Sequence, residues 1–153
     1  IDIKNISAYE QELCNYAFNK LQAVPNLKIY GGYPRIGVIS FNIDGIPHAL
    51  LGSILSREGG IGVRTGCFCT HIYVRILLGK EKEAEDVKYY EQPSAVLPGM
   101  VRISLAAYNK KEEIDRLCHF LWRIAAESDI YKKAYVYSAK EKDYVPGNNK
   151  ITL

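Results

Sequence analysis

The residues most able to do chemistry are Cys67, Cys69 and His71, which stand at every second position of one short stretch. A thiolate is a nucleophile and a metal ligand, and an imidazole is a base or a ligand. If this loop is extended, the three side chains point to one side, because side chains alternate along an extended chain. Arg64 supplies a positive charge just before the loop, and Gly66 allows a sharp turn. The stretch therefore predicts an anion site beside a reactive thiol.

Composition narrows the class of protein. The chain has 153 residues, of which 48% are hydrophobic and 24% charged, as expected for one soluble globular domain. No apolar run approaches the ~20 residues that cross a bilayer, and no secretory signal pattern opens the chain. We therefore expect no membrane partner, a cytoplasmic location and reduced thiols. The net charge of +3 comes from residues 131–153, and the balanced remainder excludes a clustered nucleic-acid footprint.

The elements that must position the loop alternate between helices and strands. The order predicts an α+β two-layer small domain, a short sheet covered by helices on one face. On the last strand, Arg102 shares a face with Ser104, opposite the apolar residues. Capping boxes are predicted at Ser7 and at Asn109. Helices are expected over residues 8–23, 47–58, 72–78 and 110–125, and strands over 27–30, 36–43, 61–64 and 101–105.

Two further expectations concern domain organisation. Residues 1–128 are predicted to form one domain, and residues 129–153 a tail of tyrosines and lysines that packs on the domain or on a partner surface. The chain starts with Ile1, and its only methionine is Met100, so we expect a piece of a longer protein. Cys14 and Cys118 fall in apolar stripes of predicted helices, which favours buried core residues over reactive thiols.

Two motifs carry a resemblance to a known family. Residues 64–69, Arg-Thr-Gly-Cys-Phe-Cys, and residues 101–109, Val-Arg-Ile-Ser-Leu-Ala-Ala-Tyr-Asn, resemble paired signatures of class V pyridoxal-phosphate-dependent aminotransferase-fold enzymes. The similarity is to the C-terminal small domain, and especially to that of cysteine desulfurases. The resemblance implies that Cys69 is the catalytic nucleophile that becomes a persulfide. It also implies that Arg102 binds the substrate carboxylate and that Arg64, at the base of the loop, belongs to the substrate site.

The resemblance leaves Cys67 and His71 as accessory residues. The Cys67-Phe68 pair resembles the Cys-Phe-Cys run of molybdenum-cofactor sulfurases, and Ile72 stands where many relatives have proline. In such enzymes pyridoxal phosphate is bound mainly by a large domain, so no cofactor-binding residue is expected in this chain. The implied partners are that large domain of the same chain, a second copy in a homodimer and a sulfur-acceptor protein. Alone, the chain is expected to be inactive.

Other functions stay open at this point. A class V aminotransferase without sulfur chemistry would keep the carboxylate role of Arg102 and leave Cys69 incidental. A small zinc or redox module would use Cys67, Cys69 and His71, with residues 118–119 as a further source of ligands. The tight spacing of its cysteines fits zinc sites poorly, so no metal is predicted. A stand-alone interaction domain would use the tyrosine-lysine tail as its contact surface.

Overall fold

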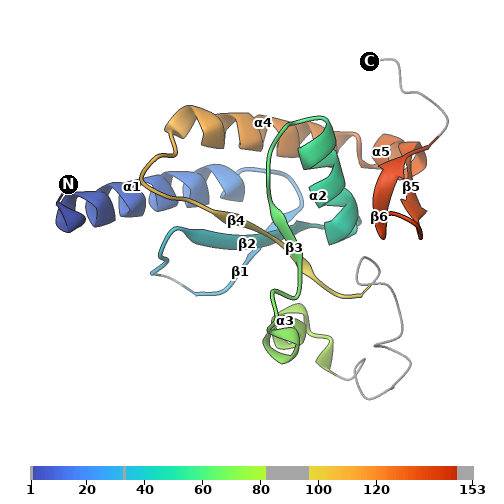
Figure 1. Cartoon of the computed structure of the whole chain (residues 1–153), viewed down its shortest axis with the longest axis horizontal. Coiled ribbons are helices and arrows are strands. Elements are labelled where there is room, and N and C mark those ends of the chain that lie inside the picture. The colour runs from blue at the N-terminus through green and yellow to red at the C-terminus, as the bar shows by residue number, and fades with distance from the viewer. Residues whose placement is uncertain (1, 33, 82–96, 148–153) are drawn as a thin grey trace.

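The computed structural model describes residues 2–32, 34–81 and 97–147. A layer of helices lies on one side of a four-stranded antiparallel sheet with the strand order β1-β2-β4-β3 (Figure 1). This arrangement confirms the predicted α+β two-layer fold. The helix layer consists of α1 (Ile3–Gln22), α2 (His48–Arg57) and α4 (Lys111–Ala126), and the strands are β1 (Leu27–Tyr30), β2 (Val38–Ile43), β3 (Arg64–Gly66) and β4 (Met100–Ser104).

The helix that follows β3 lies outside this layer. Helix α3 (His71–Leu78) follows the end of β3 and lies on the other side of the sheet in Figure 1. Within the part of the chain that the structure describes, no helix has the length and apolarity needed to cross a membrane. Residues 82–96, between α3 and β4, lie outside the described residues.

The core fills the space between the sheet and the helix layer. It forms because one face of β2 and β4 and one stripe of each helix are apolar, at periods of about 2 and 3.6 residues. Cys14 and Cys118 lie in it, as predicted, and burial raises the pKa of Cys118 to about 11. The buried residues include Leu13, Ala17 and Leu21 of α1, Ile39 and Phe41 of β2, Leu50, Leu51 and Ile54 of α2, Val101 and Ile103 of β4, and Ile114, Leu117 and Leu121 of α4.

Both predicted capping boxes are misplaced. Helix α1 begins at Ile3 rather than at residue 8, because Asp2 caps it by accepting a hydrogen bond from the Lys4 backbone N–H at 3.0 Å. The cap of α4 lies one position later than predicted: Glu113 accepts from the backbone N–H of Lys110 at 2.8 Å. The Asn109 side chain instead turns back and accepts a hydrogen bond from the backbone at residue 106.

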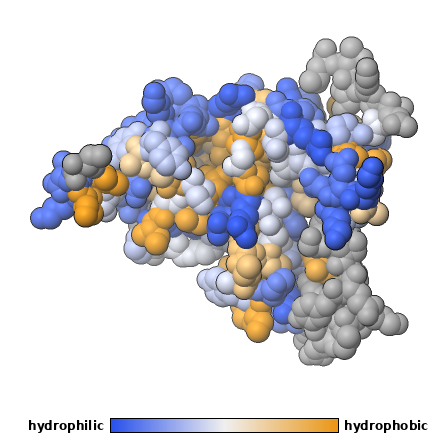
Figure 2. All heavy atoms as spheres, viewed as in Figure 1, coloured by the Kyte–Doolittle hydropathy of each residue, from blue (hydrophilic) through white to orange (hydrophobic). Residues whose placement is uncertain are grey.

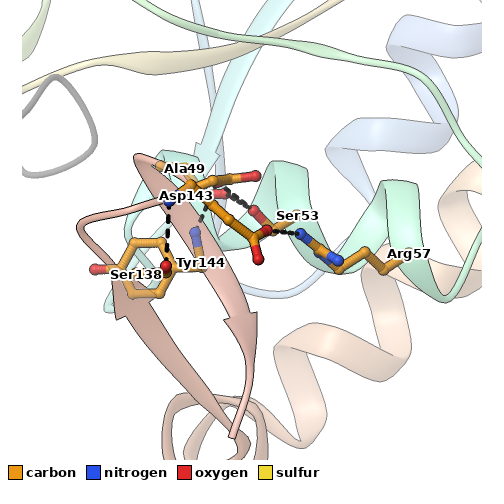
Figure 3. A network of polar contacts seen from close by, with 7 residues as sticks. Ala49, Ser53, Arg57, Ser138, Asp143 and Tyr144 are labelled. Atoms are coloured by element: carbon orange, nitrogen blue, oxygen red, sulfur yellow. Dashed lines mark hydrogen bonds and ion pairs between the residues drawn. The ribbon is translucent and has the colours of Figure 1, made fainter.

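Polar contacts fasten the C-terminal segment to α2 (Figure 3). The Ser53 hydroxyl donates to Asp143 at 2.7 Å, and Arg57 pairs with Glu141 at 3.2 Å. The boundary at residue 128 stays a prediction, and residues 148–153 lie outside the described part of the chain. The segment contains α5 (Ser128–Ala134) and a hairpin of β5 (Tyr135–Ser138) and β6 (Asp143–Pro146).

A second fastening point is Glu58, at the end of α2. Its carboxylate accepts hydrogen bonds from the Tyr135 hydroxyl at 2.9 Å and from Arg123 of α4 at 3.1 Å. Burial, reinforced by this carboxylate, raises the pKa of Tyr135. Tyr131 and Tyr135 are themselves core residues, so the segment after α4 packs as part of the same folded unit.

Candidate functional site

A row of polar residues crosses the open face of the sheet. The register pairs Tyr30 with Ser40, Ser40 with Arg102, and Arg102 with Arg64, so the row spans all four strands. Cross-strand partners share a face, and the residues that alternate with these on β2 and β4 are buried in the core. Arg64 and Arg102, both predicted as site residues, therefore lie next to each other on neighbouring strands.

The two adjacent arginines, Arg64 and Arg102, form a positively charged site that favours binding of an anion. Like charges directly opposite each other on neighbouring strands are destabilising. Arg64 is exposed and Arg102 is half-buried. Among the residues that the structure describes, the Nε atom of Arg102 is buried and has no hydrogen-bond partner. A planar guanidinium with an unsatisfied N–H, beside a second guanidinium, suits a carboxylate or a phosphate oxygen.

The cysteine loop that follows β3 is a tight turn. Phe68 and Cys69 have φ values of 53° and 62°, in the left-handed region that residues with side chains seldom adopt. The backbone N–H and the hydroxyl of Thr70 both donate to the carbonyl of Cys67, at 2.8 Å and 2.9 Å, and close the turn. The expectation of an extended loop is therefore wrong. Cys67 is half-buried and Cys69 is exposed.

The two cysteines have different surroundings. The Cys67 thiol donates to the carbonyl of Pro98 at 3.1 Å. Burial raises the pKa of Cys67, and the positive charge of Arg75 partly opposes that effect. Cys67 is consequently held as a protonated hydrogen-bond donor, whereas Cys69 presents its sulfur to solvent.

Arg75 is a residue of the site that the sequence analysis missed. It lies on α3 with only 6% of its surface exposed, and its Nε donates to the carbonyl of His71 at 3.1 Å. His71 itself is exposed at the start of α3. Arg75 follows His71 by one helical turn, so the two residues lie on the same side of α3. This helical spacing is the sequence signal that could have indicated a position beside the loop.

Phe68 joins the loop to the arginine row. Its ring centroid lies 5.0 Å from the Cζ atom of Arg102, and the guanidinium stands over the face of the ring. This distance is within the range of a cation–π interaction. Sequence analysis missed this contact because a phenylalanine between two cysteines gives no signal of which strand its ring will meet.

A second segment, residues 97–99, packs against the loop. The Nε2–H of His48 donates to the carbonyl of Leu97, and the Asn42 amide donates to that of Gly99, both at 2.9 Å. A Cβ atom at Gly99 would lie 2.6 Å from His48 Nε2 and 2.9 Å from the Cα of Gly66. Only glycine fits at this contact. The segment that accepts the thiol hydrogen bond of the loop is thus held against the start of α2 and the end of β3.

The described residues of this site form neither a metal centre nor a covalent cofactor anchor. In the described ranges 2–32, 34–81 and 97–147, no group of three or more histidine, cysteine or acidic residues is placed to hold a metal ion. Cys67, Cys69 and His71 are therefore not gathered as the ligands of a zinc site. Pyridoxal phosphate is held by enzymes as a Schiff base with a lysine. The arginine row contains no lysine among its four described residues, so it does not fit a covalent anchor for that cofactor.

Comparison with known proteins places the chain in a family. The family model described as Aminotransferase class-V matches residues 1–117, and the chain belongs to this family. Within it, the chain is similar to cysteine desulfurases. It is 41% identical over 125 residues to proteins of this name from Escherichia coli O1:K1 / APEC and Escherichia fergusonii. The match covers 81% of the chain and 26% of those proteins, so the chain spans about a quarter of their length.

Solved structures show the same fold. The apo cysteine desulfurase from Thermococcus onnurineus NA1 superposes with a TM-score of 0.60 and 22% identity, over 79% of the chain and 26% of that protein. The S-sulfonic acid form of the cysteine desulfurase CsdA from Escherichia coli gives a TM-score of 0.60 at 22% identity, over 84% of the chain and 27% of that protein. This likeness confirms the fold of a class V small domain.

Proposed function

We propose that the chain is the small-domain part of a pyridoxal-phosphate-dependent, cysteine desulfurase-like enzyme, with Cys69 as the residue that receives sulfur. One observation carries the proposal: the turn that exposes the Cys69 thiol also places its neighbouring ring on Arg102, in the arginine pair. A nucleophilic sulfur and a carboxylate site are thereby presented by one loop and one strand pair. The similarity to cysteine desulfurases supports the same assignment.

The arginine pair orients the substrate. Arg102 provides the planar N–H donors for a bidentate contact with the α-carboxylate of L-cysteine, and Arg64 adds a second positive charge beside it. The Cys69 thiolate then attacks the substrate sulfur. A sulfur–sulfur bond forms, the carbon–sulfur bond breaks, and Cys69 is left as a persulfide. Pyridoxal phosphate, held mainly by the large domain, would supply the electron sink for breaking that bond.

The lysine that anchors the cofactor would come from a large domain of the same protein, outside this chain. An apolar surface beside the loop supports such a partner. The side chains of Ile72, Tyr73 and Ile76 on α3 are 72%, 58% and 50% exposed, and Figure 2 shows apolar side chains at the surface over α3. Contiguous exposed apolar patches are typical of interaction sites. The proposal also includes that the complete protein forms a homodimer, passes sulfur to an acceptor protein and lies in the cytoplasm.

Sulfur transfer is tested in the complete protein with two matched serine variants. Cys69→Ser is expected to abolish sulfide release from L-cysteine. Cys67→Ser should only slow it, because the Cys67 thiol is a hydrogen-bond donor to Pro98 rather than an exposed nucleophile. Mass spectrometry of the loop peptide after incubation with L-cysteine should show an adduct of about 32 Da, one sulfur atom, on Cys69. Keto acid formation without this adduct would support an aminotransferase instead.

A further inference from the structure

We propose that Phe68 is a positioning residue, whose ring holds the Arg102 guanidinium in the orientation that binds the substrate carboxylate. The inference rests on the proposed function for the role of Arg102. It adds a residue whose side chain has no reactive group and acts only through the arginine that it contacts.

The local geometry limits what else can fix Arg102. Its direct neighbours on the adjacent strands are Ser40 and Arg64, and Arg64 repels it. Among the described residues, its Nε has no hydrogen-bond partner. Within the described residues, the guanidinium does contact the Phe68 ring, whose centroid lies 5.0 Å from Cζ. An attractive contact with the ring thus acts where the neighbouring charge would otherwise push the arginine away.

The chemistry of the contact leaves the binding edge available. An aromatic face attracts a guanidinium through the ring quadrupole. The donors of a guanidinium lie in its own plane and form a fork that matches a carboxylate. A ring on one face therefore restricts rotation of the group without using the N–H edge that a carboxylate needs. Apolar contact alone would fill the same volume but would not favour a cation.

The backbone keeps the ring in place at a conformational cost. Phe68 has φ of 53°, and such left-handed conformations of non-glycine residues persist when the surroundings fix them. Two hydrogen bonds from Thr70 to the Cys67 carbonyl and one from Cys67 to Pro98 hold the turn on both sides of Phe68. The same turn exposes Cys69. One strained loop therefore fixes both the position of the nucleophile and the orientation of Arg102.

Three variants separate the electrostatic role of the ring from its volume. Phe68→Leu keeps an apolar side chain and removes the aromatic face, whereas Phe68→Tyr keeps that face. Phe120→Leu is the matched control: Phe120 lies 5.0 Å from the Cζ of Arg123 on α4, outside the site. Thermal unfolding of each variant shows whether it is folded before any other measurement is interpreted.

Two readouts are used, and one is independent of catalysis. The first is the rate at which phenylglyoxal modifies Arg102, followed by peptide mass spectrometry on the chain without cofactor. The second is the inhibition constant of L-alanine, which has the carboxylate but no sulfur, against sulfide release by the complete enzyme. Phe68→Leu is expected to raise both by about two- to fivefold, the effect of losing a partly exposed cation–π contact. Phe68→Tyr and Phe120→Leu should leave both within error of the parent.

The outcomes distinguish this inference from the proposed function. Equal values in the leucine and tyrosine variants would overturn the inference, because volume alone would then explain the role of Phe68. Faster modification of Arg102 with an unchanged inhibition constant would also overturn it, by showing that the orientation of Arg102 does not matter for the carboxylate. Failure of the desulfurase proposal is detected separately, by sulfide release or the Cys69 adduct, neither of which enters the modification rate.

Discussion

We predict that the buried histidine His48, which contacts residues 97–99 beside the cysteine loop, makes the free energy of unfolding depend on pH. His48 is 6% exposed, and its Nε2–H donates to the carbonyl of Leu97. Since a carbonyl only accepts, the proton is on Nε2, and Nδ1 is a buried acceptor without a partner among the described residues. Protonation would place a charge and an unsatisfied N–H at Nδ1. Burial therefore lowers the pKa of His48 below its ordinary value of 6.5, although the hydrogen bond to Leu97 opposes this.

The sign and the size follow from proton linkage. As pH falls through 6.5, the unfolded chain takes up a proton at His48 that the folded chain does not, so the folded state loses stability. The loss between pH 7 and pH 5 is at most about 2 kcal/mol for this one group, the limit in which the folded chain takes up no proton there. His48→Gln removes the titration and keeps an amide that can donate to Leu97. Chemical denaturation at both pH values, followed by circular dichroism, gives the two free energies of unfolding.

The comparison that decides this prediction is between variants. Other groups titrate equally in the parent and in His48→Gln, so the difference between their losses isolates His48. His119→Gln, at an exposed position of α4, is the matched control for replacing a histidine by glutamine. If the parent and His48→Gln lose the same free energy between pH 7 and pH 5, His48 is not the buried neutral group described here.

Three further outcomes are expected. Arg102→Ala should weaken L-alanine binding by about 1.5–3 kcal/mol, the contribution of a charged hydrogen bond, and Arg102→Lys should restore only part of it, as inhibition constants would show. Arg64→Gln should raise the free energy of unfolding of the unliganded chain by about 0.2–1 kcal/mol, because it removes a like charge opposite Arg102, yet it should weaken carboxylate binding. An unchanged or lower free energy of unfolding would contradict the repulsion between the two arginines. Gly99→Ala should destabilise the fold by about 1–3 kcal/mol through overpacking. It should also speed alkylation of Cys67 by iodoacetamide, because the Cys67 thiol donates to the neighbouring Pro98 carbonyl. An unchanged alkylation rate would show that residues 97–99 do not protect that thiol.

The fold was largely predictable because its signals are local. The alternation on β4 put Arg102 on the face away from the core, and the apolar stripes placed Cys14 and Cys118 inside. Strand β3 was predicted too early, at residues 61–64. The backbone N–H of Ile61 donates to the carbonyl of Leu55, so that segment wraps the end of α2 instead of joining the sheet.

The site was predictable only in its parts. Motifs named Arg64, Cys69 and Arg102 as candidate residues, and their roles stay predictions, but their arrangement depends on register between distant segments. Nothing local in a sequence reports that β3 pairs with β4 and places the two arginines opposite each other. The left-handed turn at Phe68 and Cys69 was hidden for another reason: its usual markers are glycine and asparagine, and this turn uses neither at those positions.

Helix α2 connects the C-terminal hairpin to the strand that carries Arg64. A Cβ atom at Gly52 would lie 2.4 Å from the Thr65 side chain, so this helix approaches β3 more closely than any larger residue would allow. The next residue, Ser53, donates to Asp143 of the hairpin. Hairpin, helix and strand are therefore in direct contact within one turn of α2. Among the described residues, β3 pairs in the sheet with β4 alone, and its contact with α2 adds packing to the strand that carries Arg64. The C-terminal segment, which carries no predicted site residue, thus contacts the same helix that packs against the strand of Arg64.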